Sequence, residues 1–237
     1  MTRLRRAATG LCAAVLLGAL AACTNDPVRQ QGFDTAQTLA TRTLATFRGE
    51  PPAGPELQAA REPAAVQAVL AQLPPGPVIR LELPLAGQSA FAVLGGVNRD
   101  TVTFLTFSRQ SVTFRGGAVV ATRGFVFDLM GADLPDGLEA RIARRAQSRH
   151  HRSHRYLGSE DRERAMRFDC VLVPEAAERV ELVSGAAHAT TRMRETCESA
   201  TFTFNNLYWV TAGGAVVQTS QWISRELGEM HVQILRR

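Results

Sequence analysis

Two kinds of side chain in this sequence are suited to binding a charged or sugar-bearing ligand. The first is an arginine- and histidine-rich run over residues 141–155, whose candidate contact residues are Arg144, Arg145, Arg149, Arg152 and Arg155. A guanidinium binds a carboxylate through two parallel hydrogen bonds, so the run is a candidate contact for an anionic polysaccharide, a phosphate-bearing lipid surface or a partner protein. The alternative is a solvated face whose charge is offset by Glu160, Asp161 and Glu163.

The second kind is tryptophan, since both tryptophans, Trp209 and Trp222, flank the glycine pair 213–214 in a predicted hairpin. A two-residue turn there would place both indoles on one face and Tyr208 on the other, the expected core face. The indoles would be separated by roughly 13 Å along the strand, which suits two subsites of a long glycan rather than one sugar ring. A three-residue loop would separate them onto opposite faces, and structural packing is the alternative role for both.

Residues for acid–base catalysis are present without the partners that catalysis needs. Three aspartates lie near a glycine-rich turn: Asp128, Asp133 and Asp136. Paired carboxylates can cleave glycosidic bonds, but no nucleophile or metal set accompanies these three, and aspartate is also an ordinary turn residue. We therefore expect no catalytic residue and no enzymatic activity.

The histidines form an equally incomplete metal site. His150 and His154 would share one face of a strand while His151 points to the other, which is a poor tetrahedral set. The neighbouring arginines would also repel a cation. We expect no metal and no cofactor.

The N-terminus has the order of a secretory signal: three arginines, a short apolar core over residues 7–22, and small residues. The sequence at Leu20–Cys23, "LAAC", is typical of a bacterial lipobox, in which Cys23 becomes the lipidated first residue. The alternative is an ordinary cleavable signal with an incidental cysteine. Because Thr24 rather than Asp follows Cys23, and Asp there favours inner-membrane retention in enteric bacteria, we expect a lipid anchor in the outer membrane, with the chain facing the periplasm.

Export changes how charge and cysteine content are interpreted. The chain has 27 basic residues and a formal charge of +5, but three arginines leave with the signal, so the mature protein is nearly neutral. We expect no nucleic-acid partner. Cys170 and Cys197 form an even pair in an oxidising compartment, which predicts a disulfide; two buried free thiols are the alternative.

The elements that must position these residues are mainly strands. Helical spacing over residues 33–47 and 63–73 predicts one or two N-terminal helices. From residue 77, short runs rich in Val, Thr and Phe recur at intervals of about ten residues between polar turns, which indicates an antiparallel meander closing into a barrel-like domain. Residues 131–150 interrupt this pattern as a turn with a short polar helix or loop, and a hairpin with strands ending at Leu157 and Val173 follows.

Four segments together resemble one family: "TRGFVFDLMGADLP" (122–135), "HRYLGSEDRERAMRFDC" (154–170), "RETC" (194–197) and residues 204–237. Their order and spacing resemble the YjbF/GfcB lipoproteins of Gram-negative bacteria, from about residue 33 onward. One departure is visible: Thr219-Ser220-Gln221 stands where the family pattern has an Arg or Lys before the glutamine.

The resemblance implies a mainly β, barrel-like fold and a place among accessory factors of group 4 capsule and exopolysaccharide secretion. Cys23 then matches the lipobox cysteine, Cys170 and Cys197 match the paired cysteines, and no catalytic residue is carried over. It predicts a non-enzymatic protein that contacts anionic polysaccharide or polysaccharide-export proteins. The alternatives are an envelope lyase or hydrolase, and a structural lipoprotein that acts only through protein partners.

The predicted organisation has three parts. Residues 1–22 are a lipoprotein signal peptide, and residues 23–32 carry the lipidated cysteine and a tether. Residues 33–237 form a single β-rich domain with an N-terminal helical segment over 33–73.

Overall fold

The computed structural model describes residues 62–125, 127–157 and 162–237. The predicted signal peptide, Cys23, the tether and the first predicted helix lie outside the described residues. The second predicted helix is α4 (Pro63–Gln72), with a proline in its first turn, where the missing N–H is tolerated.

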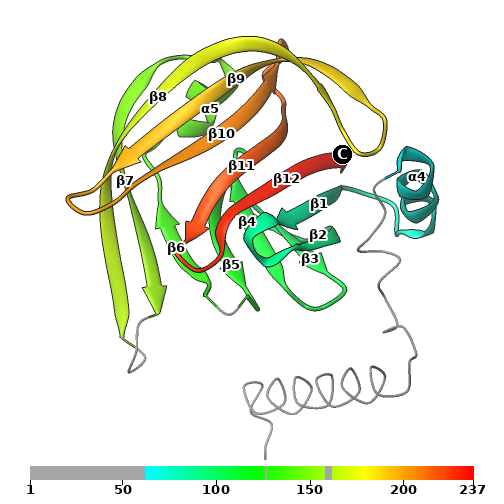
Figure 1. Cartoon of the computed structure of the whole chain (residues 1–237), viewed down its shortest axis with the longest axis horizontal. Coiled ribbons are helices and arrows are strands. Elements are labelled where there is room, and N and C mark those ends of the chain that lie inside the picture. Colours follow the sequence, from blue (N-terminus) through cyan, green and yellow to red (C-terminus); the bar gives the residue numbers. More distant parts are fainter. Residues whose placement is uncertain (1–61, 126, 158–161) are drawn as a thin grey trace, which may run out of the picture. The chain divides into compact units, whose positions relative to one another are not determined.

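The rest of the described chain is a β-meander interrupted by two short helical segments (Figure 1). The first strands are β1 (Val78–Leu83), β2 (Gln88–Asn98), β3 (Thr101–Thr106), β4 (Ser111–Arg115), β5 (Ala118–Arg123) and β6 (Leu129–Asp133). The later strands are β7 (Ser148–Leu157), β8 (Glu163–Glu181), β9 (Ala187–Glu198), β10 (Thr203–Thr211), β11 (Val216–Ser224) and β12 (Gly228–Arg236). The helical segments are η1 (Pro84–Ala86) and α5 (Leu138–Ala143).

All twelve strands belong to one antiparallel sheet that curls into a nearly closed barrel, which confirms the predicted fold class. The order is β5-β4-β3-β2-β1-β12-β11-β10-β9-β8-β7-β6, so every neighbouring pair except β1 and β12 is consecutive in the chain. The two edges approach each other because only a short loop joins β5 to β6. Arg123 at the end of β5 donates across this seam to the carbonyl oxygens of Leu129 and Met130, at 3.1 and 2.9 Å.

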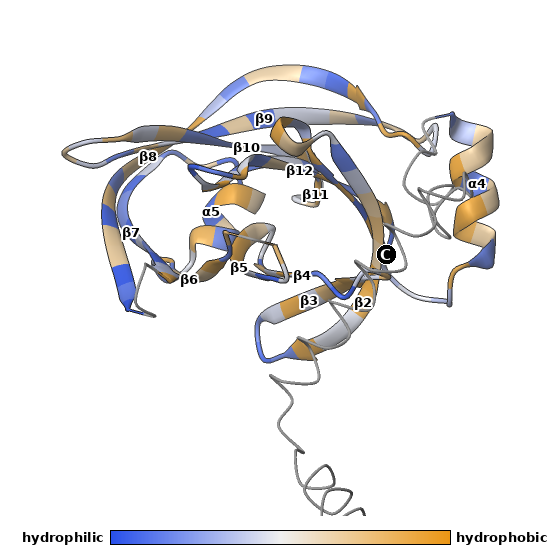
Figure 2. Cartoon of the chain, turned by 60° about the horizontal axis from the view of Figure 1, so that its bottom comes forward, coloured by the Kyte–Doolittle hydropathy of each residue, from blue (hydrophilic) through white to orange (hydrophobic). Residues whose placement is uncertain are grey.

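The barrel interior is filled by alternate residues of the strands and by α5. Leu138 and Ile142, one helical turn apart on α5, are buried against Tyr208 and Val210 of β10. Figure 2 shows α5 surrounded by strands. The short helix predicted within 131–150 therefore exists, and its apolar face serves as part of the core.

Two elements cover the outer face of the sheet. Helix α4 packs Val66 and Leu70 against Phe91 of β2. The long hairpin formed by β8 and β9 curves over to the same end of the barrel (Figure 1), where Gln67 of α4 donates to the Ser184 carbonyl oxygen at 2.9 Å. The hairpin and α4 thus form a second layer over part of the barrel wall.

Candidate functional site

A fully buried carboxylate, Glu195 on β9, organises the polar groups inside the barrel. Its Oε1 lies 2.7 Å from Nε2 of His150 on β7, and its Oε2 accepts from Nη1 of Arg152, also at 2.7 Å. Oε2 accepts further hydrogen bonds from Asn206 and Tyr208 of β10, at 2.7 and 3.0 Å. Alternation places all five side chains on the inner face of the sheet, so β7, β9 and β10 converge on one carboxylate.

The electrostatics of Glu195 are set by two opposing effects. Burial raises the pKa of the carboxyl, but the charge of Arg152 and the hydrogen bonds from His150 and Asn206 outweigh burial and lower it to about 2. A carboxylate of such low pKa that is already bonded by four side chains is a weak proton acceptor near neutral pH. The cluster is therefore arranged for holding strands together rather than for acid–base chemistry.

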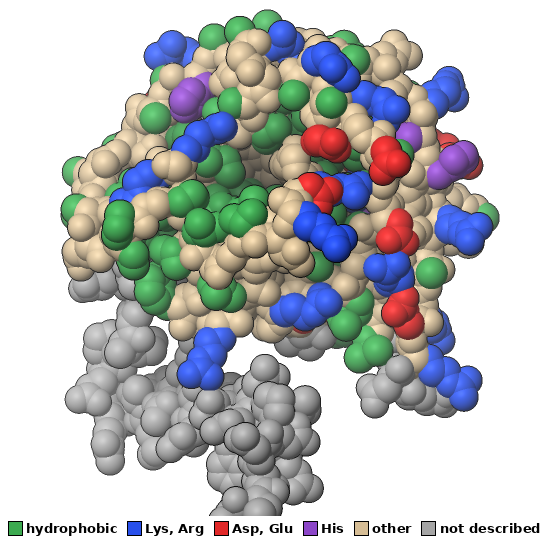
Figure 3. Space-filling view, turned by 180° about the vertical axis from the view of Figure 1, so that it is seen from behind, with side chains coloured by type: hydrophobic (Ala, Val, Ile, Leu, Met, Phe, Trp, Pro, Cys, Tyr) green, Lys and Arg blue, Asp and Glu red, His purple; other side chains and the backbone are tan. Residues whose placement is uncertain are grey.

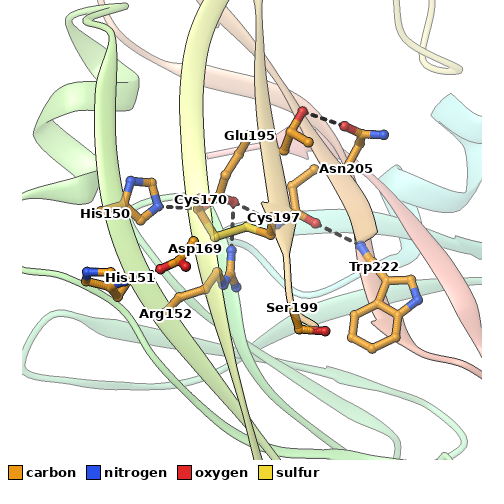
Figure 4. Close-up of a disulfide and its surroundings, with 12 residues drawn as sticks. His150, His151, Arg152, Asp169, Cys170, Glu195, Cys197, Ser199, Asn205 and Trp222 are labelled. Atoms are coloured by element: carbon orange, nitrogen blue, oxygen red, sulfur yellow. Dashed lines mark hydrogen bonds and ion pairs between the residues drawn. A yellow bond between two sulfur atoms is a disulfide. The ribbon is translucent and has the colours of Figure 1, made fainter. Parts of the chain in front are cut away.

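A disulfide lies beside this cluster, as Figure 4 shows. Cys170 of β8 and Cys197 of β9 are directly opposite in the register and are bonded, which confirms the predicted pair. Atoms of His150, Cys170 and Glu195 gather within 4.8 Å of one another. Because the Cys170 sulfur is engaged in the disulfide, this trio offers no thiolate to a metal.

The Trp222 indole belongs to an aromatic cluster next to the disulfide. Its ring stacks on Phe204 and on His154, with centroids 4.7 and 5.7 Å apart, and both of these side chains are buried. Burial and the charge of Arg152 lower the pKa of His154 well below its usual value, so its imidazole is neutral at physiological pH. Trp222 is thus a packing residue of the inner face.

Trp209 faces the opposite side of the sheet. It follows the buried Tyr208, and its Nε1 donates to Glu178 of the overlying β8–β9 hairpin. The prediction that both indoles share a face is therefore wrong. The loop has three residues, 212–214, since Thr211 N–H bonds to the Ala215 carbonyl oxygen at 2.9 Å.

The three-residue loop does not by itself explain this separation. A register shift next to Trp209 restores the pairing of Tyr208 with Thr219 that a two-residue turn would give. Farther along, the β11–β12 register shifts again between Trp222 and Ser224, and Trp222 N–H bonds to the Asn206 side chain at 2.9 Å. Such bulges re-aim side chains, and here Trp222 joins the inner aromatic rings.

The five candidate arginines do not form one basic surface. Arg152 lies inside with Glu195, and Arg155 pairs with Asp133 and Glu163 at 2.8 and 3.3 Å. Arg145 donates to the Thr211 carbonyl oxygen at 2.6 Å. Only Arg144 and Arg149 of the five are exposed. On the right-hand part of the face drawn in Figure 3, arginines also lie among acidic side chains.

The candidate aspartates have structural partners. Asp128 accepts from Gly124 N–H and from the Thr122 hydroxyl, at 2.8 and 2.7 Å, and so closes the turn between β5 and β6. Asp133 accepts from Arg155 and Ser153 on β7. Asp136 is exposed, and its carbonyl oxygen accepts from Arg141. These contacts assign the first two aspartates to turn and strand pairing.

Two grooves mark the described surface. One of about 790 Å³ lies beside Asp133, His151 and Asp169, where the imidazole and the carboxylate of the last two pair in solvent at 2.5 Å. A smaller one, of about 340 Å³, lies on the outer face of β1, β12, β11 and β10 and is lined by Trp209 and Arg80. Sequence reasoning missed Arg80 and Glu195. Arg80 lies between two apolar residues in "VIRLEL", and Glu195 shares its strand face with Met193 and Cys197 in "MRETC".

Comparison with known proteins identifies one matching family and one solved structure of similar fold. A family model described as "Group 4 capsule polysaccharide lipoprotein gfcB, YjbF" matches residues 51–235. No curated protein matches.

Among solved structures, the hypothetical lipoprotein YmcC of Escherichia coli K12 is 18% identical, with a TM-score of 0.61 over 76% of this chain and 90% of that one. An exported protein of Bacteroides fragilis with a YmcC-like fold is 10% identical, with a TM-score of 0.30 over 68% and 93% of the two chains. At 18% identity, the E. coli structure supports the fold alone.

Proposed function

Because the chain belongs to the YjbF family of group 4 capsule polysaccharide lipoproteins, we propose that it assists the export or assembly of a capsule or exopolysaccharide without catalysing a reaction. The observation that carries the non-enzymatic part is the state of Glu195. Its two oxygens are hydrogen-bonded by Arg152, His150, Asn206 and Tyr208. This buried carboxylate therefore stabilises the fold and is not free to react with a substrate.

The proposed place of action is the periplasmic side of the outer membrane. Acylated Cys23 would hold the protein there, and the lipobox and Thr24 support this sorting. None of the helices among the described residues is long and apolar enough to cross a membrane. The proposed partners are the polysaccharide itself, including anionic polymers, and the proteins that export it.

Deletion of the gene in its host tests this role. We expect less polymer at the cell surface, unchanged sugar composition of the polymer that remains, and restoration by the wild-type gene. Surface polymer is measured after mild extraction and compared with polymer retained inside the cell. Normal surface polymer in the deletion strain would contradict a role in export.

A second measurement addresses catalysis. Purified full-length protein is incubated with the host polymer, and chain length and reducing ends are followed over time. We expect no change. Shortened chains that depend on the protein would instead establish a lyase or hydrolase.

A further inference from the structure

The smaller groove on the outer face contains a buried cation with unused donors. Arg80 of β1 is only 3% exposed, and its Nη1 pairs with Glu82 at 2.5 Å. Its Nε and Nη2 have no hydrogen-bond partner among the described residues. Both atoms expose less than 1 Å², while the Arg80 side chain contributes to the lining of the groove. Buried donors without partners are costly, so two of them on an arginine that lines a groove indicate that a ligand oxygen entering beside the guanidinium supplies the missing acceptors.

The groove is also held in shape by the β8–β9 hairpin, which covers this side of the barrel. Glu178 of β8 accepts from Trp209 Nε1 and so fixes the indole. Val183 N–H donates to Gln233 Oε1 at 2.9 Å, and the Gln233 amide donates to Gln218 at 2.8 Å. Because these lining side chains are already hydrogen-bonded, they lose little conformational freedom when a ligand binds.

The mixture of lining groups identifies the ligand class. Arg80 offers donors, whereas the Glu82 and Glu229 carboxylates and the half-exposed His231 flank it, with Glu229 already bonded by Ser220 at 2.8 Å. A carboxylate ligand would satisfy Arg80 but would be repelled by both glutamates. A hydroxyl both donates and accepts, so neighbouring hydroxyls satisfy the arginine and the glutamates together.

We propose that this groove binds a neutral, hydroxyl-bearing sugar unit, with hydroxyl or ring oxygens on Arg80 Nε and Nη2 and the apolar face of the ring against Trp209. A volume of about 340 Å³ is at the lower end of ligand pockets, roughly 300–1,000 Å³, and so suits one or two sugar units. The assignment rests on the proposed function, because the exported polysaccharide would supply the sugar.

The test uses full-length protein in mild detergent and oligosaccharides released by mild acid from the host's own surface polymer. One half of the preparation is carboxyl-reduced, which converts uronic acids to neutral sugars of the same linkage. Binding is measured by calorimetry. The site is read from protection of indole fluorescence against acrylamide in a Trp222→Phe background, where Trp209 is the sole indole. We expect the carboxyl-reduced oligosaccharides to bind at least as tightly as the native ones and to protect Trp209.

Two variants and one control connect binding to the groove. Arg80→Met should weaken binding by about tenfold or more, and Arg80→Lys should weaken it as well, because an ammonium cannot reproduce the Nε and Nη2 pair. Arg164→Met, at an exposed arginine of β8 outside the groove, should bind normally. Melting temperatures confirm that each variant folds.

Every other outcome overturns the inference. Binding of the native form alone would mean that Arg80 takes a carboxylate. Equal binding by wild type and both Arg80 variants would place the site elsewhere, and no binding at all would leave only water on Arg80. Export of polymer is measured separately in cells. A negative result for sugar binding in this groove therefore does not decide the proposed function, which the deletion strain tests.

Discussion

Arg152 on β7 and Glu195 on β9 meet at 2.7 Å inside the barrel, although β8 runs between their two strands. Both side chains are almost completely buried, so the pair is an inner cross-link over β8 rather than a surface ion pair. A buried pair of this kind need not add stability relative to an apolar pair, but breaking it leaves one charge uncompensated.

Glu195→Gln should lower the free energy of unfolding by about 3–5 kcal/mol, because Arg152 then remains charged and buried without its counterion. Urea denaturation monitored by circular dichroism measures the change. The matched control is Asp133→Asn, which breaks the partly exposed pair with Arg155 and should cost less than about 1 kcal/mol. Equal effects of the two substitutions would contradict a structural role for Glu195.

Acid should destabilise the protein through the same carboxyl. The folded pKa of Glu195, about 2, lies below its usual 4.5, so its contribution is fully present above pH 4.5 and is lost as the pH falls toward 2. Unfolding free energies measured by urea between pH 6 and pH 2.5 should fall along this range. Glu195→Gln should flatten the decline, although Glu175, whose pKa is lowered by its hydrogen bond with Arg194, retains part of it. If the unfolding free energy fell equally steeply with pH in wild type and variant, Glu195 would not be the source of the acid sensitivity.

Loss of the disulfide should destabilise the barrel by about 3–4 kcal/mol, since the bond closes a loop with a sequence separation of 27 residues. The double variant Cys170→Ser/Cys197→Ser is compared with wild type in chemical denaturation. Because both cysteines are buried, reductant alone should act only when the protein is partly unfolded. Rapid alkylation of both cysteines in the native protein would disagree with this picture.

Membrane attachment should depend on Cys23, which lies outside the described residues. We expect Cys23→Ala to move the protein from the membrane to the soluble fraction, and the wild type to fractionate with the outer membrane. The control is the double variant Cys170→Ser/Cys197→Ser, which keeps Cys23 and should stay membrane-bound. Retention of Cys23→Ala in the membrane after a salt wash would mean that lipidation is not the anchor.

The fold was predictable from the sequence because its signals are local. Short runs of Val, Thr and Phe between polar turns indicate consecutive antiparallel pairing, and the strand end predicted at Leu157 is where β7 ends. The strand end predicted at Val173 is wrong, because β8 continues to Glu181. The position of Arg152 was not predictable in the same way. Both faces of β7 carry charged residues, and the partner that buries Arg152 lies 43 residues away on β9.

Side-chain direction at bulges also escaped prediction. Simple alternation places Trp222 with Trp209, but a register shift in β11 turns Trp222 toward Phe204. Arg80 escaped for a further reason, because one charged residue in an apolar strand does not reveal that its side chain is buried. Irregular register and contacts across long sequence separations therefore account for what was missed.

The two tryptophans should respond differently to substitution, since each lies on its own face of the sheet. Trp222→Ala should cost about 3 kcal/mol of stability, because it opens a cavity among Phe204, Phe202 and His154. Trp209→Ala removes an indole that packs from outside and a bond to Glu178, and should cost about 1 kcal/mol. Its main effect should be on sugar binding, which Trp222→Phe leaves intact. Denaturation measures the stability effects, and calorimetry on the same preparations measures sugar binding. A larger loss of stability for Trp209→Ala than for Trp222→Ala would contradict the placement of Trp222 in the core.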